Sequence, residues 1–138
     1  MPGTVIRMNT FTPKNWDEKI VSGTEGAPRV AHAHVTFAYT GVIEGESVCD
    51  YLLFYPGEGF DGRGTTSPGL ERIEGSVDGR KGSFVIRHEV GFDLEGVHGS
   101  WTVVPGSGTG ELAGLSGGGE ASGSMGSQTM SYTFEYSL

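Results

Sequence analysis

The sequence predicts an all-β protein, a small closed antiparallel barrel of seven or eight strands in which each strand turns one apolar face inward. Apolar and polar residues alternate with period two along most of the chain, which is the pattern of half-buried strands. The 25 glycines lie mostly between the apolar runs, where turns and barrel corners need them, and no stretch has the pattern of a core-facing helix. We expect residues 1–138 to form a single domain, because a chain of this length builds one core.

The first half of the chain is expected to supply three strands. Residues 13–21 are too polar around Trp16 for a core-facing helix and are equally compatible with a kinked strand. Residues 29–40 and 43–55 alternate clearly and are joined by a turn near Gly41. Their inward faces are expected to carry Ala31, Ala33, Val35, Phe37 and Tyr39 on the first strand and Ser47, Cys49, Tyr51, Leu53 and Tyr55 on the second.

The second half begins with a long loop, residues 56–68, which carries Phe60 and is expected to cover one mouth of the barrel. Further strands are expected at residues 69–77, 83–94, 97–104 and 129–138. In the same order, their inward faces carry Glu71, Ile73, Gly75 and Val77; Phe84, Ile86, His88, Val90 and Phe92; Trp101 and Val103; and Met130, Tyr132, Phe134 and Tyr136.

The charge balance argues against polyanionic partners. Nine basic residues face seventeen acidic ones, and the formal net charge of −8 would repel nucleic acid and anionic membrane surfaces. No apolar run is long enough to span a membrane, and the N-terminus lacks the layout of a signal peptide, so we expect a cytoplasmic location. Cys49 is the single cysteine, which excludes an intrachain disulfide.

A glycine-rich segment at residues 103–117 is similar in composition to a phosphate-binding loop. It lacks the lysine and the helix N-terminus that such a loop needs, and its Ser107 has no Gly-x-Ser-x-Gly elbow around it. The segment therefore predicts tight corners of a closed sheet, and no nucleotide or other cofactor is expected.

A register argument brings Glu71 and His88 together. Inward residues are odd-numbered on strand 69–77 and even-numbered on strand 83–94, so facing partners must have numbers of opposite parity. A two-residue turn at Gly79-Arg80 satisfies this condition and predicts that Glu71 lies directly opposite His88, about 5 Å away between Cβ atoms. Phe84 is then expected to cover Gly75.

An ionisable pair inside an apolar barrel is what proton-transfer chemistry needs, so Glu71 and His88 are the candidate acid and base. The alternative is a satisfied interior pair that only fixes the register. Inward polar and aromatic groups could orient an oxygen atom of a hydrophobic ligand, or could be ordinary core. These candidate substrate-binding residues are Tyr39, Cys49, Tyr51, Tyr55, Trp101 and Tyr132.

The sequence does not favour a metal site. His32 and His34 have a strand spacing that places both imidazoles on one face, as some metal sites require. That face points outward and no third ligand lies near in sequence, so no metal is expected.

Several segments carry a family resemblance. They are GLER at residues 69–72, GRKGSFVIRH at 79–88 and WTVVPGSGTGEL at 101–112, with weaker matches WDE at 16–18 and DYL at 50–52. On these motifs the chain resembles a bacterial family known only as a domain of unknown function, whose members are small barrels related in fold to plant allene oxide cyclase. The glycine-rich segment and the ending Tyr132-Thr133-Phe134 are similar to allene oxide cyclase itself, and the segment is also similar to plant dirigent proteins.

This resemblance implies an allene-oxide-cyclase-like barrel of eight strands around a hydrophobic cavity, in a homo-oligomer such as a dimer or trimer. Such cyclases work mainly by holding a reactive substrate in a folded conformation. The leading hypothesis is a cofactor-independent cyclase or isomerase acting on a small hydrophobic oxygenated molecule, in secondary metabolism. The alternatives are a non-catalytic barrel that binds a small hydrophobic ligand and a purely structural oligomer.

Overall fold

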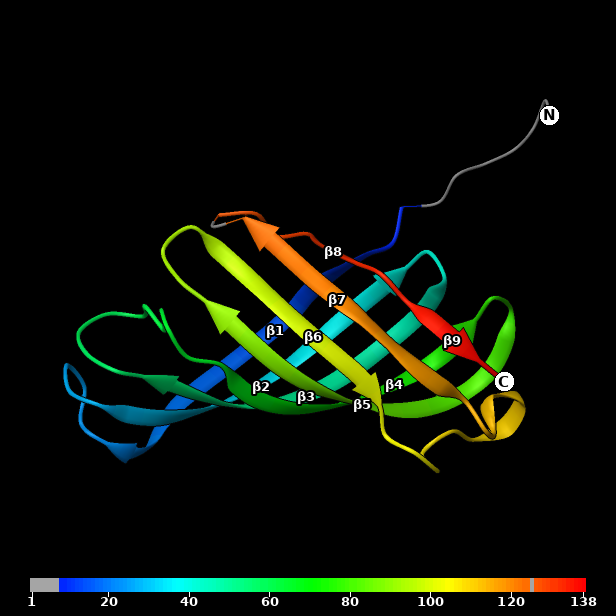
Figure 1. Cartoon of the computed structure of the whole chain (residues 1–138), viewed down its shortest axis with the longest axis horizontal. Helices are drawn as coiled ribbons and strands as arrows, with labels where there is room; N and C mark the ends of the chain where they lie inside the picture. Colours follow the sequence, from blue (N-terminus) through cyan, green and yellow to red (C-terminus); the bar gives the residue numbers. More distant parts are fainter. Residues whose placement is uncertain (1–7, 125) are drawn as a thin grey trace.

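The computed structural model describes residues 8–124 and 126–138 and confirms the all-β fold, a closed antiparallel barrel of eight strands (Figure 1). One short 3-10 helix, η1 (Gly110–Leu112), is the only helix among these residues, and it is far too short to cross a membrane. The strands are β1 (Thr10–Gly23), β2 (Arg29–Thr40), β3 (Ile43–Tyr55), β4 (Ser67–Val77), β5 (Arg80–Phe92), β6 (Gly96–Val103), β7 (Ser116–Ser124), β8 (Met130–Tyr132) and β9 (Glu135–Ser137).

The barrel closes through its C-terminal strands. Strands β1 to β7 pair with their sequence neighbours, and the short β8 lies between β7 and β1. The expected strand at residues 129–138 is divided, because the chain leaves the ladder at Thr133 and Phe134 before β9 pairs with the start of β7. Strand β7, with the sequence SGGGEASGS, was not predicted.

The expected inward faces are confirmed. The core holds the predicted aromatic and aliphatic residues of β2 to β6, while their alternate neighbours point outward. Residues 13–21 belong to β1, a strand with register shifts between Pro13 and Asn15 and between Ile20 and Ser22. These shifts give the kinked strand that the sequence left open.

The register of β4 against β5 differs from the expected one by two residues. The two-residue turn is Asp78-Gly79, not Gly79-Arg80, and both of its residues have positive φ, 48° and 83°. Primed hairpin turns require this conformation, and Asp-Gly is a preferred sequence for them. Consequently Glu71 pairs with Ile86, and His88 pairs with Gly69. Because the shift is even, every side chain keeps its predicted face.

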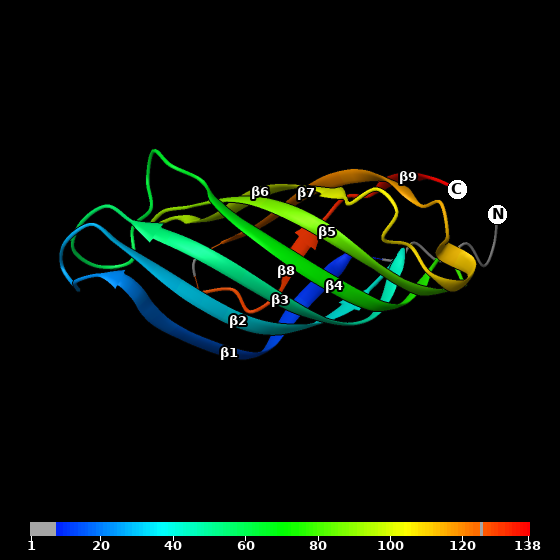
Figure 2. The same cartoon turned by 90° about the horizontal axis from the view of Figure 1, so that it is seen from below.

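The two ends of the barrel differ (Figure 2). At one end the segment between β6 and β7 folds back on β5, where the hydroxyls of Ser107 and Thr109 accept hydrogen bonds from the backbone amides of Val85 and Ser83. This segment buries Leu112 and Leu115 in the core and closes that end. At the other end the β1–β2 and β5–β6 hairpins and the loop between β3 and β4 lie together (Figures 1 and 2).

Gly75 and Gly79 are required for different reasons. Gly75 pairs with Gly45 where β3 and β4 approach closely, and a Cβ atom on Gly75 would lie 1.9 Å from the backbone oxygen of Glu44. Gly79 has open space around its Cβ position and is constrained only by its positive φ.

We therefore expect Gly75→Ala to lower the free energy of unfolding by about 3 kcal/mol, because backbone must move to admit the methyl group. The matched change Gly79→Ala should cost about 1 kcal/mol, the strain of a left-handed alanine. Urea unfolding of the two variants measures the difference. Equal losses would contradict the close approach of β3 and β4.

Candidate functional site

A buried hydrogen-bond network surrounds the carboxylate of Glu71. Its Oε1 shares a hydrogen bond of 2.6 Å with Nε2 of His88, and its Oε2 accepts hydrogen bonds of 2.5 Å from the hydroxyls of Tyr39 and Ser47. The side chains of Glu71 and His88 are 0% and 4% exposed. Four neighbouring strands, β2 to β5, thus each contribute one group to a fully satisfied buried site.

Glu71 and His88 meet diagonally, since His88 lies opposite Gly69. Diagonal neighbours across two strands are within reach of long side chains. Gly69 also leaves room for the ring of Tyr51, which lies against it and packs on the His88 imidazole with ring centroids 5.5 Å apart. The expected cover of Gly75 by Phe84 is wrong, because Gly75 pairs with Gly82; an aromatic ring covers a different cross-strand glycine, with Tyr51 over Gly69.

The two tyrosines and the cysteine near Glu71 are held in their neutral forms. Burial raises the pKa of the Tyr39 hydroxyl well above its usual value, and the nearby Glu71 carboxylate raises it further. Burial is also the main cause that raises the pKa of Tyr51 and of the Cys49 thiol. Tyr39 is accordingly a fixed hydrogen-bond donor, and Cys49 is not an activated thiolate nucleophile.

An apolar pocket of about 320 Å³ opens beside this network, toward the end of the barrel where the β3–β4 loop lies. Side chains from six strands and two loops surround it, and all but one of them are aromatic or aliphatic. Its lining consists of Trp16, Phe37, Tyr51, Leu53, Tyr55, Phe60, Val90, Phe92, Asp93, Val97 and Met130.

Two charged residues fix the rim of the pocket. Glu18 accepts hydrogen bonds from Trp16 Nε1 at 2.9 Å and from the Tyr55 hydroxyl at 2.6 Å, and so orients two lining rings. Arg29 donates to the backbone oxygens of Gly57 and Gly59 at 2.7 and 2.6 Å. Its guanidinium also lies 4.7 Å from the centroid of the Tyr55 ring.

These contacts hold the β3–β4 loop against the barrel. Phe60 in that loop packs edge-on against Tyr55 at 5.5 Å, yet 69% of its surface stays exposed. The loop therefore lies over one mouth of the barrel, as expected from the sequence.

The structure divides the candidate residues from the sequence into three groups. Tyr51 and Tyr55 line the apolar pocket, whereas Glu71 and His88 lie behind the Tyr51 ring and do not reach its lining. Cys49 is buried beside Glu71, and Tyr39 is bonded to it.

The last two candidates lie away from the pocket. Trp101 packs against Phe134 at 4.7 Å. The Tyr132 hydroxyl donates to the backbone oxygen of Thr40 and accepts from the amide of Ile43, so it fixes the β2–β3 turn.

Sequence reasoning missed most of the lining. Trp16, Phe92, Val97 and Met130 come from segments far apart in the chain, and only the closed barrel brings them together. Phe60 was recognised as part of a covering loop but not as a lining residue.

Within residues 8–124 and 126–138, two clusters hold three groups of metal-ligand type within 4.8 Å of one another, namely Cys49 with Glu71 and His88, and His32 with His34 and Asp50. The buried cluster fits a metal poorly. Glu71 and His88 already satisfy each other, and a coordinating cysteine must lose its proton, which the raised pKa of Cys49 opposes.

The fold and site define a small closed β-barrel with a buried polar network beneath an apolar pocket. Residues 8–136 match the family described as "Protein of unknown function (DUF3224)", and the chain belongs to that family. It is similar to a crystal structure, at 1.84 Å resolution, of a protein of unknown function from the DUF3224 family of Shewanella oneidensis MR-1. The two share 22% sequence identity over 96% of this chain and 99% of that one, with a TM-score of 0.62. The comparison with curated proteins gave no match.

All five tyrosines have pKa values raised above 10, and burial raises that of Tyr132 to about 12. A folded-state pKa above the unfolded one means that the native protein keeps protons that the unfolded chain loses. We expect tyrosinate absorbance to develop at higher pH in the folded than in the unfolded protein. Stability should fall as the pH rises from about 10 through about 12. Spectrophotometric titration with and without guanidinium checks this, and coincident curves would contradict it.

Proposed function

We propose that this barrel binds one small hydrophobic molecule in the apolar pocket between Trp16, Tyr51 and Phe60. The observation that carries the proposal is the lining itself. It combines rings and aliphatic groups with the single charged residue Asp93, in a cavity of about 320 Å³. Ligand pockets of proteins are mostly apolar with few polar groups, and this volume lies at the small end of their range.

The rim supports the same proposal. Phe60 and Trp16 stay 69% and 49% exposed at the mouth, although burying such rings is favourable. Both are nonetheless fixed, Phe60 by its packing on Tyr55 and Trp16 by its bond to Glu18. A ligand that covers these rings gains apolar contact without ordering them first.

Replacement of one lining residue tests this function. Leu53→Phe places a larger side chain in the cavity and should weaken binding of the uncharged apolar dye N-phenyl-1-naphthylamine. We expect its Kd to rise about 10-fold, which corresponds to a loss of about 1.4 kcal/mol of binding free energy. The control is Leu52→Phe, the same change one residue away on the outward face of β3, which should leave the affinity unchanged. Dye fluorescence measures both. No binding by the unaltered protein, or equal effects of the two variants, would refute the pocket.

A second candidate function is cofactor-independent isomerisation or cyclisation of an oxygenated ligand in this pocket. The favouring observation is Tyr51, whose ring lines the pocket while its hydroxyl is hydrogen-bonded to Cys49 beside Glu71. In this function the ring of Tyr51 moves aside to admit the ligand to Glu71, which with His88 takes a proton from the carbon next to a ligand carbonyl and returns it to another position. Tyr39 and Ser47 keep the carboxylate oriented. The resemblance to allene oxide cyclase supports the same reaction class.

For catalysis we expect Glu71→Gln to abolish exchange of α-protons for deuterium in hydrophobic enones, a loss of at least about 100-fold typical of a removed general base. Dye binding should stay within about twofold because Glu71 does not line the pocket. The control is Glu74→Gln, an exposed carboxylate on the same strand. Proton NMR follows the exchange. If the unaltered protein binds the enones without exchange, the barrel is a binding protein only.

A further inference from the structure

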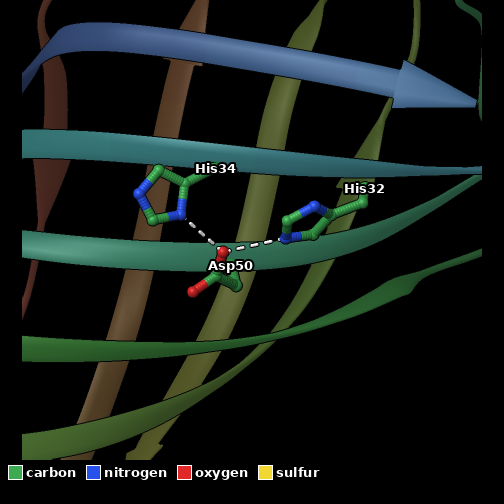
Figure 3. A group of neighbouring side chains, drawn as sticks. All are labelled: His32, His34 and Asp50. Atoms are coloured by element: carbon green, nitrogen blue, oxygen red, sulfur yellow. Dashed lines mark hydrogen bonds and ion pairs between the residues drawn. The ribbon is translucent and has the colours of Figure 1, made fainter.

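The outward face of β2 and β3 carries a second polar cluster, on the opposite side of the sheet from the Glu71 network. His32 and His34 are two residues apart on β2, and Asp50 on β3 pairs with His34. Figure 3 shows both imidazoles pointing toward the carboxylate of Asp50, which lies between them. Oδ1 of Asp50 is 2.8 Å from Nε2 of His32 and 2.7 Å from Nδ1 of His34.

We propose that His32, His34 and Asp50 form a binding site for a divalent transition metal of the zinc type. Imidazole nitrogens and carboxylate oxygens are ligands that Zn²⁺ takes in proteins. One ligand atom from each of the three residues already lies within 4.8 Å of the others. Neighbouring ligands of a tetrahedral zinc ion are about 3.4 Å apart, so small side-chain rotations bring the three atoms to coordination distance.

The backbone that carries the three ligands is rigid, because all three residues lie in paired strands. Alternation places His32 and His34 on one face of β2, and the ladder between β2 and β3 fixes Asp50 beside them. Two ligands from one strand and a third from its neighbour thus converge without any loop. Such a site loses little conformational freedom when a metal binds.

Accessibility and charge both suit a metal ion. The side chains of His32, His34 and Asp50 are 34%, 47% and 50% exposed, so an ion reaches them from solvent. Three protein ligands leave a coordination position for water, the arrangement of zinc sites that exchange ligands. The net charge of −8 favours cations over the whole surface.

The flanking residues on the same face come from β1 and β4. Asp17 pairs with His34 and adds negative charge beside the site, whereas Lys19 pairs with His32 and opposes it. Leu70 pairs with Asp50 from the other side. The proposal does not depend on the apolar pocket, because these ligands lie on the outer surface of the barrel.

The test is zinc binding by the full chain without a polyhistidine tag, measured by calorimetry after treatment with chelator. We expect one ion per chain. The double variant His32→Ala/His34→Ala and the single variant Asp50→Asn should each weaken zinc binding by about 100-fold or more. Replacing a residue that only hydrogen-bonds to a metal ligand already lowers metal affinity by about 10- to 100-fold, and these variants remove the ligands themselves. The control is His98→Ala, an exposed histidine on the outward face of β6, which should leave the affinity unchanged.

Cobalt identifies the ligands independently of affinity. Co²⁺ bound by His32, His34 and Asp50 should give visible ligand-field bands without a thiolate charge-transfer band. Saturating zinc should also raise the Tm by several degrees, and the double variant should lose this increase. Binding that survives the double variant, or a thiolate band from Cys49, would overturn the proposal.

Discussion

The charge of Glu71 is the constraint on which the interior of this barrel depends. A carboxylate with no exposed side-chain surface costs several kcal/mol to remove from water, and only complete hydrogen bonding offsets that cost. Tyr39, Ser47 and His88 supply the three contacts. Because each comes from a different strand, a shift of any one strand would remove one of these contacts. The network therefore helps to fix the register of β2 to β5 together with the surrounding apolar packing.

The same network divides the interior of the barrel along its length. On one side of it, Leu112 and Leu115 fill the end of the barrel. On the other side, Tyr51 separates the polar groups from the apolar pocket. A ligand in that pocket meets rings and methyl groups first and reaches polar chemistry only past Tyr51. Binding of a hydrophobic molecule therefore needs only the pocket, whereas catalysis by Glu71 needs the ligand to pass Tyr51.

Much of the fold could be predicted from alternation alone. Strands 29–40 and 43–55 have the expected bounds, and the inward faces are those that the sequence indicates. The contact between Glu71 and His88 was expected from a register of β4 against β5 that is wrong by two residues. The contact exists nonetheless, because both side chains are long enough to meet across a diagonal. The Asp78-Gly79 turn could have been recognised, since Asp-Gly is a strong hairpin signal. Strand β7 could not, because its glycines and serines carry no strand propensity and it forms through pairing with β6, β8 and β9.

The site residues that escaped prediction were missed because they meet across strands. No third ligand lies near His32 and His34 in sequence, but in an antiparallel sheet the nearest neighbour of a residue lies on the adjacent strand. The inward faces of β2 and β3 both hold odd-numbered residues, so facing partners have numbers of equal parity. The short turn after Thr40 leaves few registers of that kind, and one of them sets Asp50 opposite His34, as observed. The parity of this hairpin therefore indicates that Asp50 meets the two histidines, just as the parity of β4 and β5 indicates that Glu71 meets His88. In an antiparallel sheet, the third ligand of a site lies on the neighbouring strand and can be far away along the chain.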